Sequence, residues 1–333
     1  MKLQKFRKGT VPIALALLIL TLVACTNFWN NQANSSLPKN VAIAYQPSIN
    51  YAPLMLVKYK ETLEEQFPNI NFQWKALAKA SAIQEKMLAN QLQVGAGDIE
   101  TFLVGWDKGV GWKLLASLNH TDYWLVVKDP NINSLKDFKP GMKIGLSARD
   151  SIQAILLRLA AQKELGNPIA LDKSIVEIPP NLGLQALQRG EIAGHFTTPP
   201  FQFQEVEKGG RVIFKSTDIL VGKTSTANLF MTEGFYQQYP DFAKALYAAV
   251  SQATINLNEK PNEAAKVLEN EGRSKVSRKQ FKKWITNEAL SYSLVPKGFL
   301  KQGQLMREAG ILNKEPKSIE ELILPTLHGV GGD

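Results

Sequence analysis

The amino-acid sequence predicts an α/β fold with two lobes joined by two crossing strands. Short apolar runs alternate with helical segments, this alternation occurs twice along the chain, and a later strand runs back toward the first set of elements. Alternating strands and helices are typical of a parallel sheet covered by helices on both faces. We therefore expect two sheets, a hinge at the crossings and a cleft between the lobes.

The first lobe, expected over residues 40–122, opens with the apolar run 41–45, which is typical of a buried parallel strand. Pro47 interrupts this run. Ser81 is well placed to cap a helix, because its hydroxyl can accept a hydrogen bond from a free backbone amide. The predicted elements are strands over 41–45, 71–77 and 94–97 and helices over 52–66 and 81–92.

The second lobe, expected over residues 123–224, repeats the pattern after a strand over 122–128. The turn and small-residue strand at 188–195 is similar to the segment 89–96 of the first lobe. Residues 225–333 should then return to the first lobe. The predicted elements are strands over 142–146, 175–178 and 225–231 and helices over 152–165, 182–188, 240–258, 262–271 and 278–292.

The N-terminus has the features of an export signal. Basic residues precede an apolar run over 11–23, which is shorter than the roughly 20 residues that a membrane-spanning helix needs. The run ends in Leu22-Val23-Ala24-Cys25, which resembles the lipobox of bacterial lipoproteins. We therefore expect residues 1–24 to be a signal peptide, Cys25 to carry a lipid, and residues 25–39 to tether the body to the periplasmic or extracellular face of a membrane.

The composition limits the class of function. The net charge is +9, and four of these charges lie in the expected signal peptide, so the mature part carries about +5 (9 minus 4). No block of Lys and Arg with interleaved aromatic residues occurs, so nucleic-acid binding is not expected. Cys25 is the single cysteine, which leaves the mature body without disulfides, thiolate–metal sites or a cysteine nucleophile.

The sequence contains no recognisable catalytic or metal-binding pattern. The G-x-S-x-G turn of α/β hydrolases is absent, and Gly222-Lys223-Thr224 lacks the first glycine of a P-loop because Thr217 occupies that position. The histidines His120, His195 and His328 do not have the spacing of metal ligands. We therefore expect neither an enzyme nor a bound cofactor.

Several loosely matching segments, taken in their order and spacing, carry a family resemblance. Together they resemble the ABC-transporter substrate-binding proteins for nitrate, taurine and alkanesulfonates and for the pyrimidine precursors of thiamine. The segments span much of the mature chain and are 41–47, 50–54, 82–98, 134–145, 185–192 and 235–241.

The resemblance implies a periplasmic-binding-protein-like fold of type II and a function in transport. Such a protein captures a small molecule and delivers it to an ABC permease, whose ATPase is a separate chain; we expect a monomer. The favoured ligand is a sulfonate, nitrate or taurine-like anion. The alternatives are a pyrimidine or other heteroaromatic precursor, or a ligand sensor without transport. Fungal pyrimidine synthases of similar architecture are enzymes, but they use a cysteine-rich iron motif that this chain lacks.

The crossings predict the motion that accompanies binding. The lobes should close on the ligand by rotation at the two strands near Asp122 and Ser225. The loops 147–150 and 197–201 depart from the pattern usual in the family, so the resemblance does not fix the ligand.

The candidate ligand-binding residues follow from the position of the loops. In a two-lobed α/β protein the ligand lies beyond the C-terminal ends of the strands, against helix N-termini whose free amides favour an anionic group. These loops contain Gln46, Ser48, Asn50, Tyr51, Ser81, Asp98, Ile99 and Thr101 in the first lobe, and Ser147, Arg149, Asp150, Ser151, Thr197 and Thr198 in the second.

Some of these residues discriminate between ligands. Tyr51 can stack on a flat ligand. Arg149 can form a two-pronged contact with a sulfonate or carboxylate, or can pair with Asp150 or another acid. Asp98 would repel an oxyanion and suit an amine or a pyrimidine, unless it caps the next helix. Thr197 and Thr198 either contact the ligand or cap the segment before Pro199 and Pro200.

Overall fold

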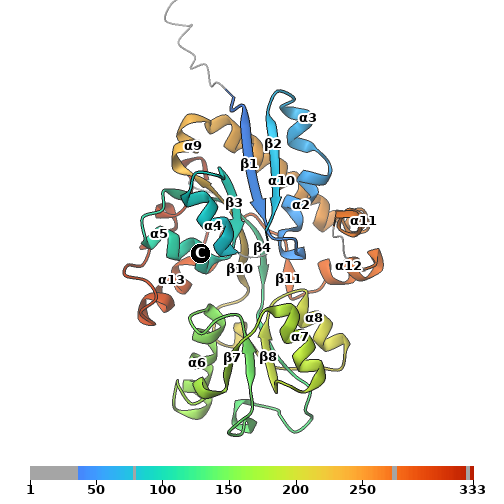
Figure 1. Cartoon of the computed structure of the whole chain (residues 1–333), viewed down its shortest axis with the longest axis vertical. Helices are drawn as coiled ribbons and strands as arrows, with labels where there is room; N and C mark the ends of the chain where they lie inside the picture. Colours follow the sequence, from blue (N-terminus) through green and yellow to red (C-terminus); the bar gives the residue numbers. More distant parts are fainter. Residues whose placement is uncertain (1–36, 78–79, 272–275, 328–330) are drawn as a thin grey trace, which may run out of the picture. The chain divides into compact units, whose positions relative to one another are not determined.

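The computed structural model describes residues 37–77, 80–271, 276–327 and 331–333, which form two β-sheets flanked by helices (Figure 1). Residues Leu37–Asp333 belong to one structural unit. The expected signal peptide, Cys25 and nearly all of the expected tether lie outside the described residues. Within the described ranges, no helix combines the length and the hydropathy that crossing a membrane requires.

The first sheet combines strands from distant parts of the chain. In spatial order its strands are β11 (Leu290–Ser291), β4 (Trp112–Thr121), β10 (Thr224–Thr232), β3 (Val94–Gly97), β1 (Asn40–Tyr45) and β2 (Asn71–Ala76). β1 pairs in parallel with β2 and β3, whereas β10 runs antiparallel to both β3 and β4. The return strand β10 therefore inserts into the middle of the first sheet.

Alternating side chains of β1 connect the sheet to two helical layers. Val41 and Ile43 point into a core shared with α2 and α10, whereas Ala42 and Ala44 point into a core shared with α4 and α5. The helices of this lobe are α2 (Ala52–Tyr59), α3 (Thr62–Gln66), α4 (Ala80–Leu88), α5 (Ile99–Asp107), α9 (Glu233–Gln238), α10 (Pro240–Glu259), α11 (Pro261–Glu271), α12 (Arg278–Ile285) and α13 (Phe299–Glu308).

The second sheet is built from the middle of the chain alone. In spatial order its strands are β7 (Ile175–Glu177), β6 (Ile144–Leu146), β8 (Gly194–Thr197), β5 (Trp124–Val127) and β9 (Arg211–Lys215). β6 is parallel to β7 and β8, and β5 is antiparallel to β8 and β9. Its helices are α6 (Ile152–Leu165), α7 (Pro180–Arg189) and α8 (Phe201–Glu207).

The two crossings between the sheets are hydrogen-bonded to each other. The first crossing runs from β4 through Asp122 and Tyr123 to β5, and the second runs from β9 through Ser216 and Thr217 to β10. The Asp122 carboxylate accepts hydrogen bonds from the Ser216 hydroxyl (2.5 Å) and from the Thr217 amide and hydroxyl (both 3.1 Å). The Ser216 amide also donates to the Tyr123 carbonyl at 2.9 Å. The crossings therefore form one linked segment.

The structure confirms the predicted fold class: two α/β lobes connected twice. The predicted strands 41–45, 71–77, 142–146 and 225–231 correspond to β1, β2, β6 and β10. Three predicted helices, over 52–66, 81–92 and 278–292, have different ends in the structure. The sequence patterns also missed β4, β9, β11, α8, α9 and α13.

The errors have local causes. The predicted helix 52–66 breaks before α3 because Glu61 adopts a left-handed conformation with φ of 51°. The predicted helix 278–292 ends at Ile285, since the Asn287 side chain accepts a hydrogen bond from the Ala289 amide and turns the chain into β11. Ser81 lies inside the first turn of α4 instead of preceding it.

Candidate functional site

A chain of buried amide groups connects the two lobes. The Asn50 side chain donates a hydrogen bond to the carbonyl of Pro199 in the second lobe (3.0 Å) and accepts one from Asn119 on β4 (3.0 Å). Asn119 in turn accepts hydrogen bonds from the Thr226 hydroxyl (3.0 Å) and the Ala227 amide (2.8 Å) on β10. Because buried amides need partners, this chain fixes the loop after β1 against the loop after β8.

Two acids lie at the N-terminus of α5. Asp98 is the N-cap residue and accepts a 2.7 Å hydrogen bond from the Thr101 amide. Burial raises the pKa of the Asp98 carboxyl above its ordinary value, although this hydrogen bond opposes the shift. Burial, followed by the nearby charge of Asp98, raises the pKa of Glu100 to about 8. Glu100 is therefore mostly protonated at neutral pH.

Glu100 faces the second lobe. The backbone amide of Ile152, the first residue of α6, is close enough to the Glu100 carboxyl to lower its pKa partially. The second carboxyl oxygen of Glu100 is buried and has no hydrogen-bond partner among the described residues. An acid of the first lobe thus opposes a helix N-terminus of the second, a place that favours negative charge.

Two buried tyrosines share the environment of these acids. Burial raises the pKa of the Tyr51 hydroxyl, and the charges of Asp98 and Glu100 raise it further. The pKa of Tyr123 is raised by burial, then by Glu100, Asp98 and Tyr51. The amide of Gln46 donates to the Tyr51 hydroxyl at 2.6 Å. We call Tyr51, Asp98, Glu100 and Tyr123 the acid–tyrosine cluster.

The second lobe contributes hydroxyl and amide groups. Ser151 caps α6, because its hydroxyl accepts from the Ala154 amide, and it also donates to the Ala148 carbonyl at 2.6 Å. The Ser147 hydroxyl donates to the side-chain carbonyl of Gln153 at 3.0 Å. The Thr197 hydroxyl is buried at the end of β8 and has no partner among the described residues. Thr197 is thus available to a ligand, whereas the two serines are engaged locally.

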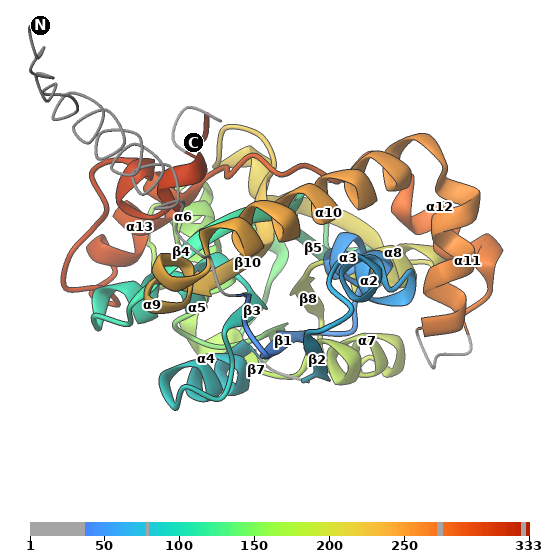
Figure 2. The same ribbon diagram turned by 90° about the horizontal axis from the view of Figure 1, so that it is seen from above.

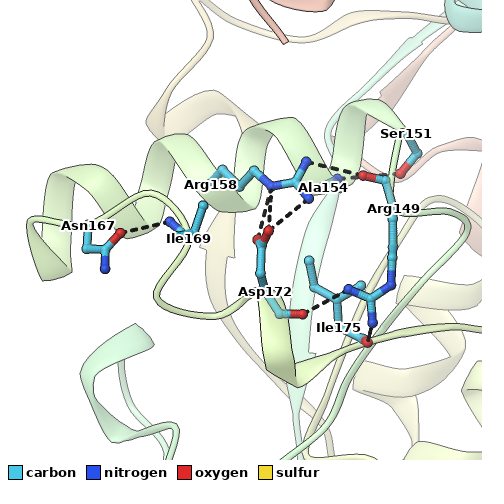
Figure 3. A network of polar contacts seen from close by, with 8 residues as sticks. All are labelled: Arg149, Ser151, Ala154, Arg158, Asn167, Ile169, Asp172 and Ile175. Atoms are coloured by element: carbon cyan, nitrogen blue, oxygen red, sulfur yellow. Dashed lines mark hydrogen bonds and ion pairs between the residues drawn. The ribbon is translucent and has the colours of Figure 1, made fainter. Parts of the chain in front are cut away.

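Arg149 is bound to the backbone of its own lobe (Figure 3). Its guanidinium donates to the carbonyls of Asp172 (2.9 Å) and Ile175 (2.5 Å), and its amide donates to the Glu177 carboxylate (2.8 Å). Asp150 is exposed beside it. Arg149 therefore braces the segment before β7, a role that the sequence did not suggest.

The remaining predicted residues have structural positions. Ser48 caps the short 3₁₀-helix Ile49–Tyr51, Ile99 is fully buried in the core, and Thr101 uses its amide for the Asp98 cap. Ser81 is exposed on α4. The carbonyl of Thr198 accepts from the Phe201 and Gln202 amides at the start of α8. Of the predicted set, the structure brings together Gln46, Asn50, Tyr51 and Asp98 from the first lobe.

Sequence reasoning missed several residues at the junction. Glu100 follows Asp98 by two positions and therefore shares the first turn of the same helix. Tyr123 lies on the predicted crossing. Asn119 and Asn228 carry buried side chains on β4 and β10, and both polar atoms of the Asn228 side chain have no partner among the described residues. Asparagine is depleted in β-strands, and this was the available signal for Asn119 and Asn228.

A second contact joins the lobes on the side of α8 and α12, which lie next to each other in Figure 2. The carboxylate of Glu207 in α8 accepts hydrogen bonds from Gln280 (2.8 Å) and Trp284 (3.3 Å) of α12 and pairs with Lys283 of α12 (2.9 Å). We call these four residues the Glu207 clasp. No group of three or more potential metal ligands occurs among the described residues.

Comparisons with known proteins agree with this architecture. Residues 35–269 match the model of the NMT1-like family. No curated protein matches the chain. Among solved structures, the periplasmic aliphatic sulphonate-binding protein SsuA of Escherichia coli is similar, with a TM-score of 0.69 at 16% identity over 86% of this chain and 92% of that chain.

Two other solved structures are also similar. The ligand-binding component of an ABC-type import system from Staphylococcus aureus, with zinc bound, has a TM-score of 0.69 at 19% identity over 87% of this chain and 98% of that chain. The nitrate-binding protein NrtA of Synechocystis PCC 6803 has a TM-score of 0.65 at 14% identity over 85% of this chain and 84% of that chain. These similarities establish the periplasmic-binding-protein fold.

Proposed function

The chain belongs to the NMT1-like family, and from this premise we propose that it captures a small molecule between its lobes and passes it to an ABC importer. One similar solved structure is the ligand-binding component of an ABC-type import system and another is a periplasmic sulphonate-binding protein, which supports the proposal. We further propose that Cys25 carries a lipid, that the body is held at the outer face of a membrane as a monomer, and that a permease and its ATPase are separate chains. The alternative is a ligand sensor of the same fold.

The acid–tyrosine cluster is the observation that carries this proposal. Its members come from the loop after β1, the start of α5 and the first crossing, and Glu100 opposes the α6 amide across the lobes. Groups that belong to different rigid bodies can change their separation when the lobes move. A ligand bound at this cluster would therefore be sensed by both lobes.

The charges at the cluster favour one class of ligand. A negative charge on Asp98 opposes an oxyanion, and Glu100 adds a second negative charge once the pH exceeds about 8. The guanidinium of Arg149 is engaged by backbone carbonyls and offers no compensating charge to the ligand. Two tyrosines offer aromatic faces. We propose that the ligand carries a cationic or hydrogen-bond-donating nitrogen on a flat ring, as an aminopyrimidine does. This choice replaces the anion that the family resemblance favoured.

An anionic ligand is the second candidate, for two reasons. SsuA and NrtA are named for sulphonate and nitrate binding, and the N-terminus of α6 presents the Ile152 amide to the site. With a pKa of about 8, Glu100 is protonated at pH 7 and can donate a hydrogen bond to an oxyanion.

In this proposal the two lobes close on the ligand by rotating at the linked crossings. Opening would break the Asn50–Pro199 hydrogen bond and the Glu207 clasp, while Asp122 keeps the crossings together. Ligand contacts on both lobes would then favour the closed state, because a ligand shifts an equilibrium by its differential affinity for the two states.

A thermal-shift screen tests capture, and its pH dependence tests the ligand class. Aminopyrimidines and other amines are compared with sulfonates, taurine and nitrate. An amine stabilised by ionised Glu100 should bind more tightly as the pH rises through about 8, whereas an oxyanion that needs protonated Glu100 should bind more weakly over that range. Stabilisation by anions alone would overturn the ligand class but keep the capture function, and stabilisation by no compound would contradict capture. Loss of ligand uptake on deletion of the gene would support transport over sensing.

A further inference from the structure

A pocket on the outer side of α11 and α12 is lined almost entirely by basic residues. Its volume is about 390 Å³, and Asn262, Arg278, Lys279 and Lys282 line it. This volume lies within the range of small-molecule sites. The pocket belongs to the first lobe and shares no residue with the acid–tyrosine cluster.

The cations of this pocket are weakly compensated. Lys279 and Lys282 are exposed and have no hydrogen bond or ion pair from their side chains to the residues that the structure describes. Arg278 contacts Glu269 at 3.6 Å, and both side chains remain substantially exposed. The pocket therefore retains an excess of positive charge.

Two of these cations occupy unfavourable positions in α12 itself. Arg278 and Lys279 occupy the first turn, where the helix dipole disfavours positive charge. Lys282 lies three and four residues after them, so like charges repel along one face of the helix. An anion in the pocket would offset both effects, which gives the arrangement a physical reason.

The faces of α12 that do not line the pocket hold the helix in place. Phe281, Trp284 and Ile285 are buried, and Gln280 and Lys283 point to Glu207 in the second lobe. The basic face is therefore presented by a helix that cannot easily rotate away.

We propose that this pocket binds a phosphate-type anion, either free or as the headgroup of an anionic phospholipid. Lysine ammonium and arginine guanidinium groups, together with the Asn262 amide, supply the donors that a phosphoryl group accepts. Because α12 also carries three members of the Glu207 clasp, an anion bound here acts on the helix that contacts the second lobe.

Hydrogen exchange of residues 278–285 in the purified full chain tests the proposal. The chain is mixed with vesicles of phosphatidylcholine, with vesicles that contain equal parts of phosphatidylcholine and phosphatidylglycerol, and with phosphatidylcholine vesicles plus inorganic phosphate at matched ionic strength. Slower exchange only with the anionic vesicles supports a lipid headgroup, and slower exchange with inorganic phosphate supports a free anion. Unchanged exchange in all three conditions overturns the proposal.

Paired variants identify the pocket as the cause. The double variant Lys279→Gln/Lys282→Gln should bind anionic vesicles about 30-fold more weakly, from about 1 kcal/mol for each lysine near such a surface. The control Lys136→Gln/Lys173→Gln removes two exposed lysines of the second lobe. Equal weakening of vesicle binding in both double variants would indicate non-specific attraction and would also overturn the proposal. Hydrogen exchange of the β1 amides shows whether the variants are folded.

Discussion

The side chain of Asn50 donates a 3.0 Å hydrogen bond to the backbone carbonyl of Pro199, although 149 positions separate them and they lie in different lobes. Both residues are buried, and the same Asn50 side chain accepts from Asn119. The Asn50 side chain therefore links a loop of the first lobe to a loop of the second. It can form this hydrogen bond only when the lobes are together.

Asn50→Ala should favour opening of the lobes. It leaves the Pro199 carbonyl and the Asn119 amide without their partner, which costs about 1–3 kcal/mol in a buried environment. We expect a lower melting temperature and a larger radius of gyration in small-angle scattering. Asn71→Ala, which removes an exposed 2.9 Å contact with Asn40, is the control and should change neither quantity. An unchanged scattering curve for Asn50→Ala would contradict this role.

Glu207→Gln should weaken the second contact between the lobes. The variant keeps the shape of the side chain but loses its charge, so the ion pair with Lys283 disappears and the hydrogen bonds from α12 weaken. Since Lys283 is mostly exposed, we expect at most about a fivefold change in the closed-to-open ratio. Hydrogen exchange of α12 measures it. Glu191→Gln, which breaks an exposed pair with Arg189 inside the second lobe, should leave α12 unchanged.

Glu100 should make the stability of the protein fall as the pH rises from about 5 to about 9. Its pKa is raised to about 8 in the folded protein from an ordinary value of 4.5, so the folded state binds the proton more tightly. The stabilisation is complete below the unfolded value and is lost as the pH rises through the folded one. Melting temperatures across this range measure it.

The matched variant isolates Glu100 from other titrating groups. Glu100→Gln cannot ionise, so its melting temperature should decline less between about pH 5 and 9 than that of the wild type. Glu263→Gln changes an exposed acid on α11 and should retain the wild-type slope. Hydrogen bonds from the Asn133 and Ser134 amides lower the pKa of Asp137. Asp137 therefore makes the stability rise with pH, and it does so below about pH 5. Identical slopes for Glu100→Gln and the wild type would refute the assignment.

Gly183→Ala should destabilise the second lobe. A Cβ atom at this position would lie 2.3 Å from Nε2 of the fully buried His195. The other ring nitrogen of His195, Nδ1, lies 2.5 Å from the Glu205 carboxylate and holds the ring in place. Overpacking of this kind costs about 1–3 kcal/mol. Chemical denaturation measures the loss. Gly234→Ala on α9 meets no atom within 4 Å and should be neutral or stabilising; equal effects of the two substitutions would argue against overpacking.

Local patterns predicted the elements that depend on nearby residues. The apolar run at 41–45 and the capped helix after Ser151 form as expected, because strand burial and helix capping are visible within a few positions. The return strand expected over residues 225–231 lies within β10. The fold class follows from this repetition of local signals.

The site was less predictable because its partners are distant in the sequence. Asp98 was expected either to cap a helix or to meet the ligand, and only the structure reveals that it caps α5 and also shares its environment with Tyr123. Arg149 satisfies carbonyls that belong to another loop, and Glu207 meets a helix more than seventy positions away. Such pairings depend on the three-dimensional packing of the lobes.

The linkage of Asp122 to Ser216 and Thr217 has a consequence for how the motion can be observed. If the two connections moved independently, one lobe could both twist and bend relative to the other. Because the connections are hydrogen-bonded to each other, fewer such motions remain. The relative position of the lobes should then be described by a single angular coordinate. One distance between a probe on each lobe would report the whole transition.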